Sequence, residues 1–200
     1  MTTSYYPATS LCPVLLAGLR GTVLELGPGA GGNLVHYHED VRWIGVEPKA
    51  ANRERTRRTA ATLGRPDARV LPGRAEQLDL PDQSVDAVAA TFVLCSVGDL
   101  DAALAEIVRV LRPGGRYVFA EHVAAPAGTG LRRGQNVYTA ATRLFGIGCR
   151  SNRETLPAIE RAGLAFVDLH RYTLSGPFGA GIPHIAGAAR RPTIEKGRTA

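Results

Sequence analysis

The sequence lacks any apolar run of the roughly 18 residues that a membrane-spanning helix requires. The apolar segment 11–19 is too short, contains Pro13 and Gly18, and follows no basic residues, so it does not predict a signal peptide. Of the 200 residues, 44% are hydrophobic and 21% are charged, a balance typical of one globular domain with a substantial core. We therefore expect a cytoplasmic protein without a membrane anchor, present as a monomer or a homodimer.

Cysteine is scarce, since only Cys12, Cys95 and Cys149 occur. This odd number at wide spacings matches neither a disulfide framework nor a zinc motif, and it favours a reducing compartment. Cys149 is expected to be an inert buried thiol, because no obvious neighbour lowers its pKa. His36 and His38 would point to different faces of one helix, so we expect no metal pair there and no bound metal.

Acidic residues are in the minority, with 18 against 24 basic residues and a net charge of +6. The basic residues concentrate in segments 53–74 and 190–198, and no aromatic residue lies among them to stack on nucleic-acid bases. We interpret these segments as a solvated helix face and a flexible basic tail. The sequence therefore predicts no nucleic-acid partner.

Glycine is plentiful, and the most informative pattern is the run VLELGPGAGGN, which begins at Val23. The run fits the dinucleotide-binding pattern G-x-G-x-x-G at Gly27, Gly29 and Gly32. It also fits the E-x-G-x-G-x-G pattern of S-adenosylmethionine (SAM) methyltransferases at Glu25, Gly27, Gly29 and Gly31. Glu25 favours the second pattern, because a carboxylate suits a ligand that carries an ammonium and a sulfonium, and it repels a pyrophosphate.

Strand and helix patterns alternate up to residue 123, which predicts a parallel, doubly wound sheet with helices on both faces. Two further strands joined without a helix must pair antiparallel. The expected class is α/β: a Rossmann-like three-layer sandwich with a mostly parallel seven-stranded sheet and an antiparallel last strand. Strands are expected over residues 22–26, 41–46, 68–71, 84–94, 116–123, 164–174 and 182–189. Helices are expected over residues 30–37, 49–63, 100–111, 135–145 and 153–162.

Capping residues mark some of these boundaries. Asp99 is placed to cap the helix over 100–111, and the segment 112–115 is expected to end that helix. Ser151 or Asn152 is placed to cap the helix over 153–162. We expect a single domain that comprises an N-terminal lid (1–20), a SAM-binding core (22–123), a substrate-side insertion with the terminal strand hairpin (124–190), and the tail (191–200).

A cofactor site is expected where the parallel strands end. Glu47 closes the second strand, where an acid can accept both hydroxyls of a ribose. The turn around Ala75 and Glu76 is placed to meet the edge of an adenine, and the end of the fourth strand forms the floor of the cleft. The expected cofactor residues are Glu25, Gly27, Pro28, Gly29, Gly31, Asn33, Glu47, Pro48, Ala75, Glu76, Thr91, Leu94 and Cys95.

Several blocks in order resemble class I SAM-dependent methyltransferases of type 11, the branch that includes the ubiquinone and menaquinone biosynthesis C-methyltransferases. These blocks are VLELGPGAGGN from Val23, GVEP from Gly45, PDQSVDAVAATFVLCSV from Pro81 and EIVRVLRPGGRYVFAEH from Glu106. They cover about half of the chain, and their joint occurrence is specific. The resemblance implies SAM as cofactor, S-adenosylhomocysteine as product, and methyl transfer to a small molecule.

A narrower resemblance points to the methyltransferase-like 7 family of thiol S-methyltransferases. It rests on LCSV from Leu94, RVLRPGG from Arg109, EHV from Glu121, GC from Gly148, RET from Arg153 and PHIAG from Pro183. Animal members of that family carry an apolar membrane anchor at the amino terminus, and this sequence shows no such segment. The resemblance implies methylation of the sulfur of a small thiol.

His122, at the end of the fifth strand, is the candidate catalytic base or orienting residue. A thiol ionises near pH 8.5, so a strong base is optional for sulfur and more urgent for oxygen or carbon. An O- or C-methyltransferase of a quinone-like or secondary metabolite, a non-catalytic SAM-binding protein and a nicotinamide enzyme remain as alternatives. The expected substrate contacts are Tyr6, Gln135, Tyr138, Cys149 and His184.

Overall fold

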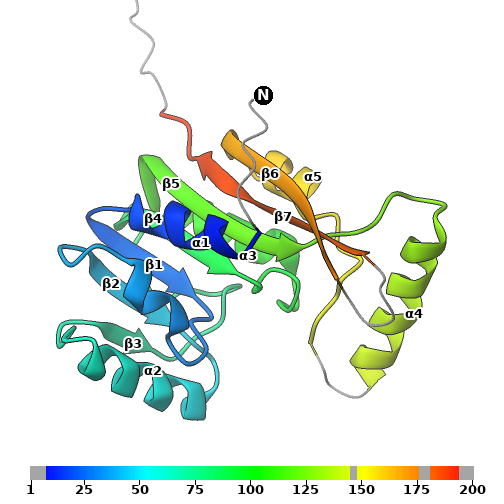
Figure 1. Ribbon diagram of the computed structural model, residues 1–200. Coiled ribbons are helices and arrows are strands. Elements are labelled where there is room, and N and C mark those ends of the chain that lie inside the picture. The colour runs from blue at the N-terminus through cyan, green and yellow to red at the C-terminus, as the bar shows by residue number, and fades with distance from the viewer. Residues whose placement is uncertain (1–7, 145–147, 176–180, 194–200) are drawn as a thin grey trace, which may run out of the picture.

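A computed structural model of the chain describes residues 8–144, 148–175 and 181–193. These residues form one seven-stranded sheet with the strand order β3-β2-β1-β4-β5-β7-β6 (Figure 1). Neighbouring strands pair parallel from β3 to β5, whereas β7 is antiparallel to both β5 and β6. The predicted α/β class, with a mostly parallel sheet and an antiparallel last strand, is confirmed. The strands are β1 (Thr22–Leu26), β2 (Arg42–Val46), β3 (Arg69–Leu71), β4 (Val85–Thr91), β5 (Leu111–His122), β6 (Ala165–Ser175) and β7 (Gly181–Arg190).

Helices cover both faces of this sheet because residues along each buried strand alternate between two cores. Leu24 and Leu26 of β1 belong to one core, together with buried side chains of the helices α3 and α5. Val23 belongs to the other, together with side chains of α1, η1 and α2. The helix α4 stands apart from both layers, on the side toward which β1, β4 and β5 point (Figure 1). The helices are α1 (Ala8–Ala17), η1 (Gly32–His36, a 3₁₀ helix), α2 (Ala50–Thr62), α3 (Leu100–Val110), α4 (Gly130–Leu144) and α5 (Thr155–Arg161).

Two helix starts differ from the sequence prediction. The helix expected from residue 135 begins at Gly130, because the Thr129 hydroxyl accepts a hydrogen bond from the Arg132 N–H and caps it (3.2 Å). The helix expected with Ser151 or Asn152 as its cap begins later, after Glu154. Asn152 is unavailable as a cap because its side chain bonds to residues of α4.

Two further elements also differ in detail. The helix expected over 30–37 is the 3₁₀ helix η1, which follows Gly31 in a left-handed conformation (φ 82°). The helix α3 is capped by Asp99 as predicted, with a bond from the Ala102 N–H to the carboxylate (3.0 Å). It ends at Val110, and the segment 112–115 lies within β5, in a register shift opposite β4.

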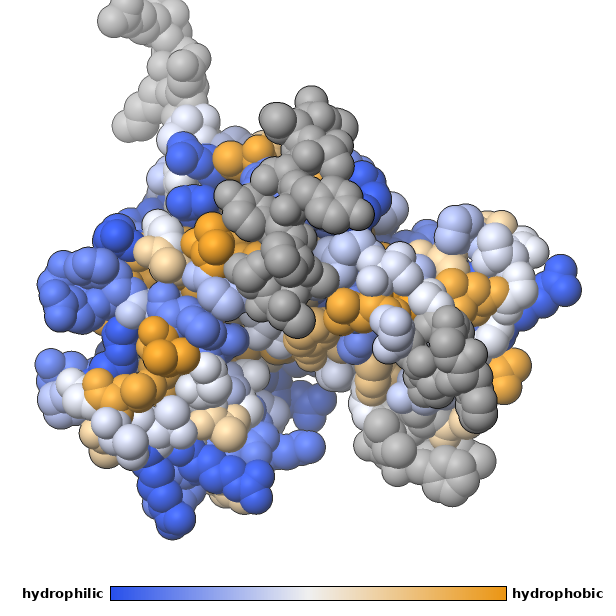
Figure 2. All heavy atoms as spheres, viewed as in Figure 1, coloured by the Kyte–Doolittle hydropathy of each residue, from blue (hydrophilic) through white to orange (hydrophobic). Residues whose placement is uncertain are grey.

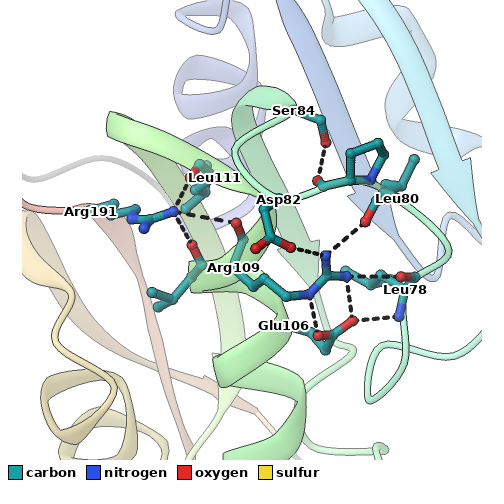
Figure 3. A network of polar contacts seen from close by, with 10 residues as sticks. Leu78, Leu80, Asp82, Ser84, Glu106, Arg109, Leu111 and Arg191 are labelled. Carbon is teal, nitrogen blue, oxygen red and sulfur yellow. Dashed lines mark hydrogen bonds and ion pairs between the residues drawn. The ribbon is translucent and has the colours of Figure 1, made fainter.

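Polar contacts tie α3 to the loop before β4 (Figure 3). The Arg109 guanidinium donates to both carboxylate oxygens of Glu106 (2.6 and 2.8 Å) and to the carbonyls of Leu78 and Leu80 (2.9 and 2.8 Å). The Glu106 carboxylate also accepts from the Leu78 N–H (2.6 Å). At the end of the helix, Arg191 donates to the carbonyl of Val108 (2.8 Å), one of the groups that a helix terminus leaves unpaired. These bonds hold the element that follows the end of β4.

In the described ranges, no helix combines the length and apolarity needed to cross a membrane.

Candidate active site

The glycine loop after β1 has a backbone that only glycine adopts without strain. Gly27, Gly29 and Gly31 all have positive φ values, of 56°, 60° and 82°. A Cβ on Gly27 would lie 2.9 Å from a methyl carbon of Val93, whereas a Cβ on Gly29 would meet no atom within 4 Å. Gly29 therefore borders open space that a side chain would fill, as a site for a closely approaching ligand requires.

Glu25 supports this loop from inside the sheet. Its carboxylate is 1% exposed and accepts hydrogen bonds from the Asn33 amide (2.8 Å), the Tyr37 hydroxyl (2.9 Å) and the Trp43 indole N–H (3.0 Å). Burial raises the pKa of Glu25, and these three donors oppose the rise. The sequence predicted a carboxylate that faces a bound ammonium. In the structure its donors come from the protein, and Asn33 extends the network to Thr91 at the end of β4 (2.9 Å).

Glu47 lies beside the glycine loop at the end of β2, as the sequence predicted. Its carboxylate accepts from the Gly29 N–H (3.2 Å) and the Lys49 N–H (2.9 Å). Pro48 follows it on the surface. The carboxylate thus connects the loop to the beginning of α2, and the fold brings together two of the expected cofactor residues.

The turn after β3 is bound to the loop after β4. The Glu76 carboxylate accepts from the Gly98 N–H (2.6 Å) and forms an ion pair with Arg74 (3.7 Å). Ala75 is buried next to it. The expected residues of this turn therefore lie against the edge where β4 ends.

Glu121 is a functional residue that the sequence analysis missed. It is fully buried on β5, and its carboxylate accepts from three consecutive N–H groups of the loop after β4: Val93 (2.9 Å), Leu94 (2.8 Å) and Cys95 (3.1 Å). Burial raises the pKa of Glu121 to about 7, and the N–H groups oppose that rise. A single carboxylate at the end of an apolar strand was the signal that could have identified it.

Arg153 holds the same loop through its carbonyl groups and was also missed. Its guanidinium donates to the carbonyls of Leu94 (2.6 Å), Val97 and Gly98 (3.4 Å). The neighbouring backbone adds a bond from the Arg150 N–H to the Cys95 carbonyl (2.7 Å). The loop after β4 is therefore fixed from both sides, and its conformation does not depend on its own sequence alone.

A row of rings crosses the carboxyl end of β5. His122, His184 and Tyr172 lie opposite one another on β5, β7 and β6, with ring centroids 4.5 Å and 5.3 Å apart. The ring centroid of Phe92 lies 5.1 Å from that of His122. Phe92 is exposed, and its backbone has a positive φ of 56°. A strained backbone that places an aromatic ring in solvent is typical of a functional site. Burial lowers the pKa of His184, whose Nδ1 bonds to the Ile182 carbonyl (2.7 Å).

Cys149 has neighbours that the sequence prediction did not include. It is half-buried, and its Sγ lies 3.8 Å from His122 Nδ1. Hydrogen bonds to Cys95 and then to His122 lower the pKa of Cys149 to about 5, whereas the same contact and burial raise the pKa of Cys95. These neighbours favour the ionised form of Cys149, so the expectation of an inert thiol without such neighbours is corrected. Its spacing in the sequence gave no sign of these neighbours.

The remaining substrate-side residues do not form one group. Gln135 uses its whole amide inside the protein: the oxygen accepts from the Ala125 N–H (2.7 Å), and the nitrogen donates to the carbonyls of Val123 (3.0 Å) and Ser151 (2.9 Å). Its expected role as a substrate contact is therefore corrected to a cross-link between segments. Tyr138 is 51% exposed on α4, whereas Tyr6 lies outside the described residues.

The expected N-terminal lid also differs where it is described. The helix α1 buries Leu11, Leu15 and Leu16 in the core on one face of the sheet, so it packs as a structural layer. Figure 2 shows a notch between α4 and the part that holds β1 to β3.

Comparison with known proteins identifies the family. Residues 24–119 match a protein family described as a methyltransferase domain. The human (Homo sapiens) thiol S-methyltransferase TMT1A is 34% identical over 171 residues, which make up 84% of this chain and 70% of that protein. The chain belongs to the class I SAM-dependent methyltransferases. This agrees with the family resemblance of the sequence blocks.

Solved structures share the fold of the methyltransferase. The YcgJ protein from Bacillus subtilis matches it with a TM-score of 0.76 at 19% identity, covering 92% of this chain and 99% of that one. Geranyl diphosphate C-methyltransferase from Streptomyces coelicolor A3(2), in complex with Mg²⁺, geranyl-S-thiolodiphosphate and S-adenosyl-L-homocysteine, matches with a TM-score of 0.72. It is 24% identical, and the match covers 92% of this chain and 74% of that one.

SAM is the cofactor of the methyltransferase, as of its family, and the geometry of the site fits this group. The open space above Gly29 accepts a ligand that approaches the backbone, and the neighbouring Glu47 carboxylate is an acceptor for hydroxyl groups. Bound SAM supplies a methyl group on a positively charged sulfur. The glycine loop and Glu47 are the residues that would hold the cofactor.

Proposed function

We propose that this methyltransferase transfers the methyl group of SAM to the sulfur of a small thiol. The similarity to human thiol S-methyltransferase TMT1A, at 34% identity over most of both chains, carries this proposal. The positions of His122 and Cys149 support the proposal. Both are half-buried near the carboxyl end of β5, at the edge of the sheet where the glycine loop also lies, so an acceptor beside them would be near the cofactor.

The cofactor residues take complementary parts in this proposal. The glycine loop faces the methionine portion of SAM, and Glu47 accepts hydrogen bonds from the two ribose hydroxyls. The turn at Ala75 and Glu76 meets the adenine. Leu94 and Cys95 form the floor of the cleft, which Glu121 and Arg153 keep in place. Glu25 acts from below through Asn33.

The reaction needs positioning more than acid or base catalysis. The acceptor thiolate attacks the methyl carbon in line, a carbon–sulfur bond forms, and the electron pair of the broken bond remains on S-adenosylhomocysteine. Opposite charges cancel during this step, so a cleft that excludes water favours it. The chain therefore has to align two sulfur atoms at near-attack distance. His122 and the ring of Phe92 are placed to orient the acceptor.

The test is a mass-spectrometric screen of the protein with SAM against alkyl thiols, aromatic thiols, phenols and quinols. We expect thioethers from alkyl thiols. At low acceptor concentration, the rate should rise with pH and level off near the acceptor's own pKa, because the thiolate reacts. If the protein methylates phenols or quinols and no thiol, the proposal of a sulfur acceptor is wrong and the acceptor atom is oxygen or carbon.

A further inference from the structure

Three potential metal ligands from distant parts of the sequence meet at the carboxyl end of β5. The Sγ atoms of Cys95 and Cys149 and a ring nitrogen of His122 all lie within 4.8 Å of one another. Cys95 belongs to the loop after β4, His122 ends β5, and Cys149 follows α4. We propose that Cys95, His122 and Cys149 form a zinc site next to the cofactor cleft.

The distances suit this metal. In a tetrahedral site with Zn–S bonds of about 2.3 Å and Zn–N bonds of about 2.0–2.1 Å, ligand atoms lie roughly 3.5–3.8 Å apart. Cys149 Sγ and His122 Nδ1 are already 3.8 Å apart. The widest separation of the group exceeds the tetrahedral value by only about 1 Å, which side-chain rotation can supply.

The ligand types favour zinc over other cations. Among the described residues, the group contains two thiols and one imidazole and no carboxylate, whereas Mg²⁺ and Ca²⁺ require oxygen ligands. The nearby Glu121 carboxylate is occupied by three backbone N–H groups. Two thiolates neutralise Zn²⁺, which lowers the cost of burying the charges, whereas a monovalent copper ion would leave one negative charge.

The surrounding residues hold the ligands in place. The backbone of Cys95 is fixed by Glu121 on its N–H side and by Arg150 on its carbonyl side. The bond from Arg150 also brings Cys149, the preceding residue, next to Cys95. The ring of His122 packs against those of Phe92 and His184, which also contact each other. Partners that orient the ligands in this way are typical of metal sites in proteins.

Three protein ligands leave one of the four zinc positions open, as in catalytic zinc sites. If the proposed function holds, the acceptor thiol fills this position: its proton leaves to solvent, and zinc holds the thiolate toward the methyl group. After transfer, the product is a neutral thioether, a weaker ligand that dissociates. This role rests on the proposed function, whereas the metal site itself does not.

The site can be tested with cobalt as a spectroscopic substitute for zinc. The full chain is reduced, freed of metal with a chelator, and titrated with Co²⁺. We expect one equivalent of Co²⁺ to bind. The spectrum should show a thiolate-to-cobalt charge-transfer band and the visible bands of tetrahedral cobalt, and added zinc should displace the cobalt. Cys149→Ser and His122→Ala should each weaken binding by at least about 10- to 100-fold. Cys12→Ser is the matched control, because Cys12 lies on α1 outside the group, and it should bind as the parent does.

The outcomes separate the two proposals. A parent protein that binds no cobalt, or tight binding that persists in both Cys149→Ser and His122→Ala, overturns the zinc site. A disulfide between Cys95 and Cys149 in the freshly purified protein, detected by peptide mass spectrometry, also overturns it. Stabilisation by S-adenosylhomocysteine shows that each variant is folded.

A small alkyl thiol added to the cobalt form should shift its bands. No shift would leave the metal site intact and contradict its role in binding the acceptor. Thiol methylation by a protein that binds no metal would leave the proposed function intact.

Discussion

Single buried carboxylates organise the loops of this methyltransferase. Glu121 and Glu47 both accept backbone N–H groups, from the loop after β4 and from the glycine loop. A carboxylate in this role replaces water for several donors at once and favours one loop conformation. The two residues differ in position: Glu121 is fully enclosed, whereas Glu47 borders the proposed ribose site.

Glu47→Gln should weaken the binding of S-adenosylhomocysteine by roughly 10- to 100-fold, because the amide loses the charge and one of the two acceptors for the ribose hydroxyls. Isothermal titration calorimetry measures this change. The control is Glu54→Gln, which removes the same charge from an exposed position on α2. Equal affinities in the parent and in Glu47→Gln would remove Glu47 from the cofactor site.

Glu121→Gln should lower the free energy of unfolding by about 1–3 kcal/mol. The amide nitrogen cannot accept a hydrogen bond, so at least one buried N–H of the loop loses its partner. Urea unfolding measures the difference, with Glu160→Gln on the surface of α5 as control. A loss that is no larger than in the control would show that the loop does not depend on this carboxylate.

The helix α3 is an element held at both ends and along one face. Asp99 caps its beginning, Arg191 bonds to its last turn, and Leu104 and Ile107 face the core. Arg109 and Glu106 tie its solvent side to the loop before β4 (Figure 3). Because the loop after β4 leads directly into α3, this docking also limits the movement of the cleft floor.

Glu106→Gln should reveal the contribution of this docking through its pH dependence. Hydrogen bonds and charge from Arg109 lower the pKa of Glu106 in the folded protein, so the ionised carboxylate stabilises the fold. Its contribution, about 1–2 kcal/mol, is present above the ordinary carboxyl pKa of about 4.5 and is lost as the pH falls through the lowered value.

Urea unfolding of the parent and the variant measures this effect. The pH range, from about 3 to about 7, includes both sides of the ordinary carboxyl pKa. The difference between the two proteins should be largest near neutral pH and should shrink under acid. Asp67→Asn, an exposed charge removal, is the control. A difference that stays constant with pH would contradict the lowered pKa.

Part of the positive charge of the whole molecule is used within the protein, as three arginines of α2 show. Arg53 donates to the carbonyls of Glu47 (3.1 Å) and Pro48 (2.8 Å), and Arg57 donates to the carbonyl of Val70 (3.2 Å). Arg58 pairs with Glu54 (3.1 Å). Arg53 and Arg57 therefore support the protein's own backbone, whereas Arg58 is exposed and pairs with a side chain. The absence of a nucleic-acid partner stays a prediction.

Binding to DNA or RNA should accordingly be weak, independent of sequence and lost as salt increases from about 50 to 200 mM. Fluorescence anisotropy with labelled oligonucleotides at several salt concentrations measures this. Sequence-selective binding that survives at the upper salt concentration would show a recognition surface on the basic segments.

The sequence by itself determined the elements whose cause is local. The glycine loop, the Asp99 cap and the alternating strands follow from neighbouring residues, and strand order then places Glu47 beside Gly29. The meeting of the proposed cofactor residues was therefore predictable, since the ends of parallel strands meet at one edge of the sheet.

Only the tertiary structure decided the acceptor side. Cys95, His122 and Cys149 come together because the pairing of β4, β5 and β7 and the path of the chain after α4 bring three distant segments to one point. No spacing in the sequence encodes that meeting. The same reason explains why Glu121 was missed and why Gln135 was assigned to the substrate: their partners are backbone groups of segments far away in the sequence.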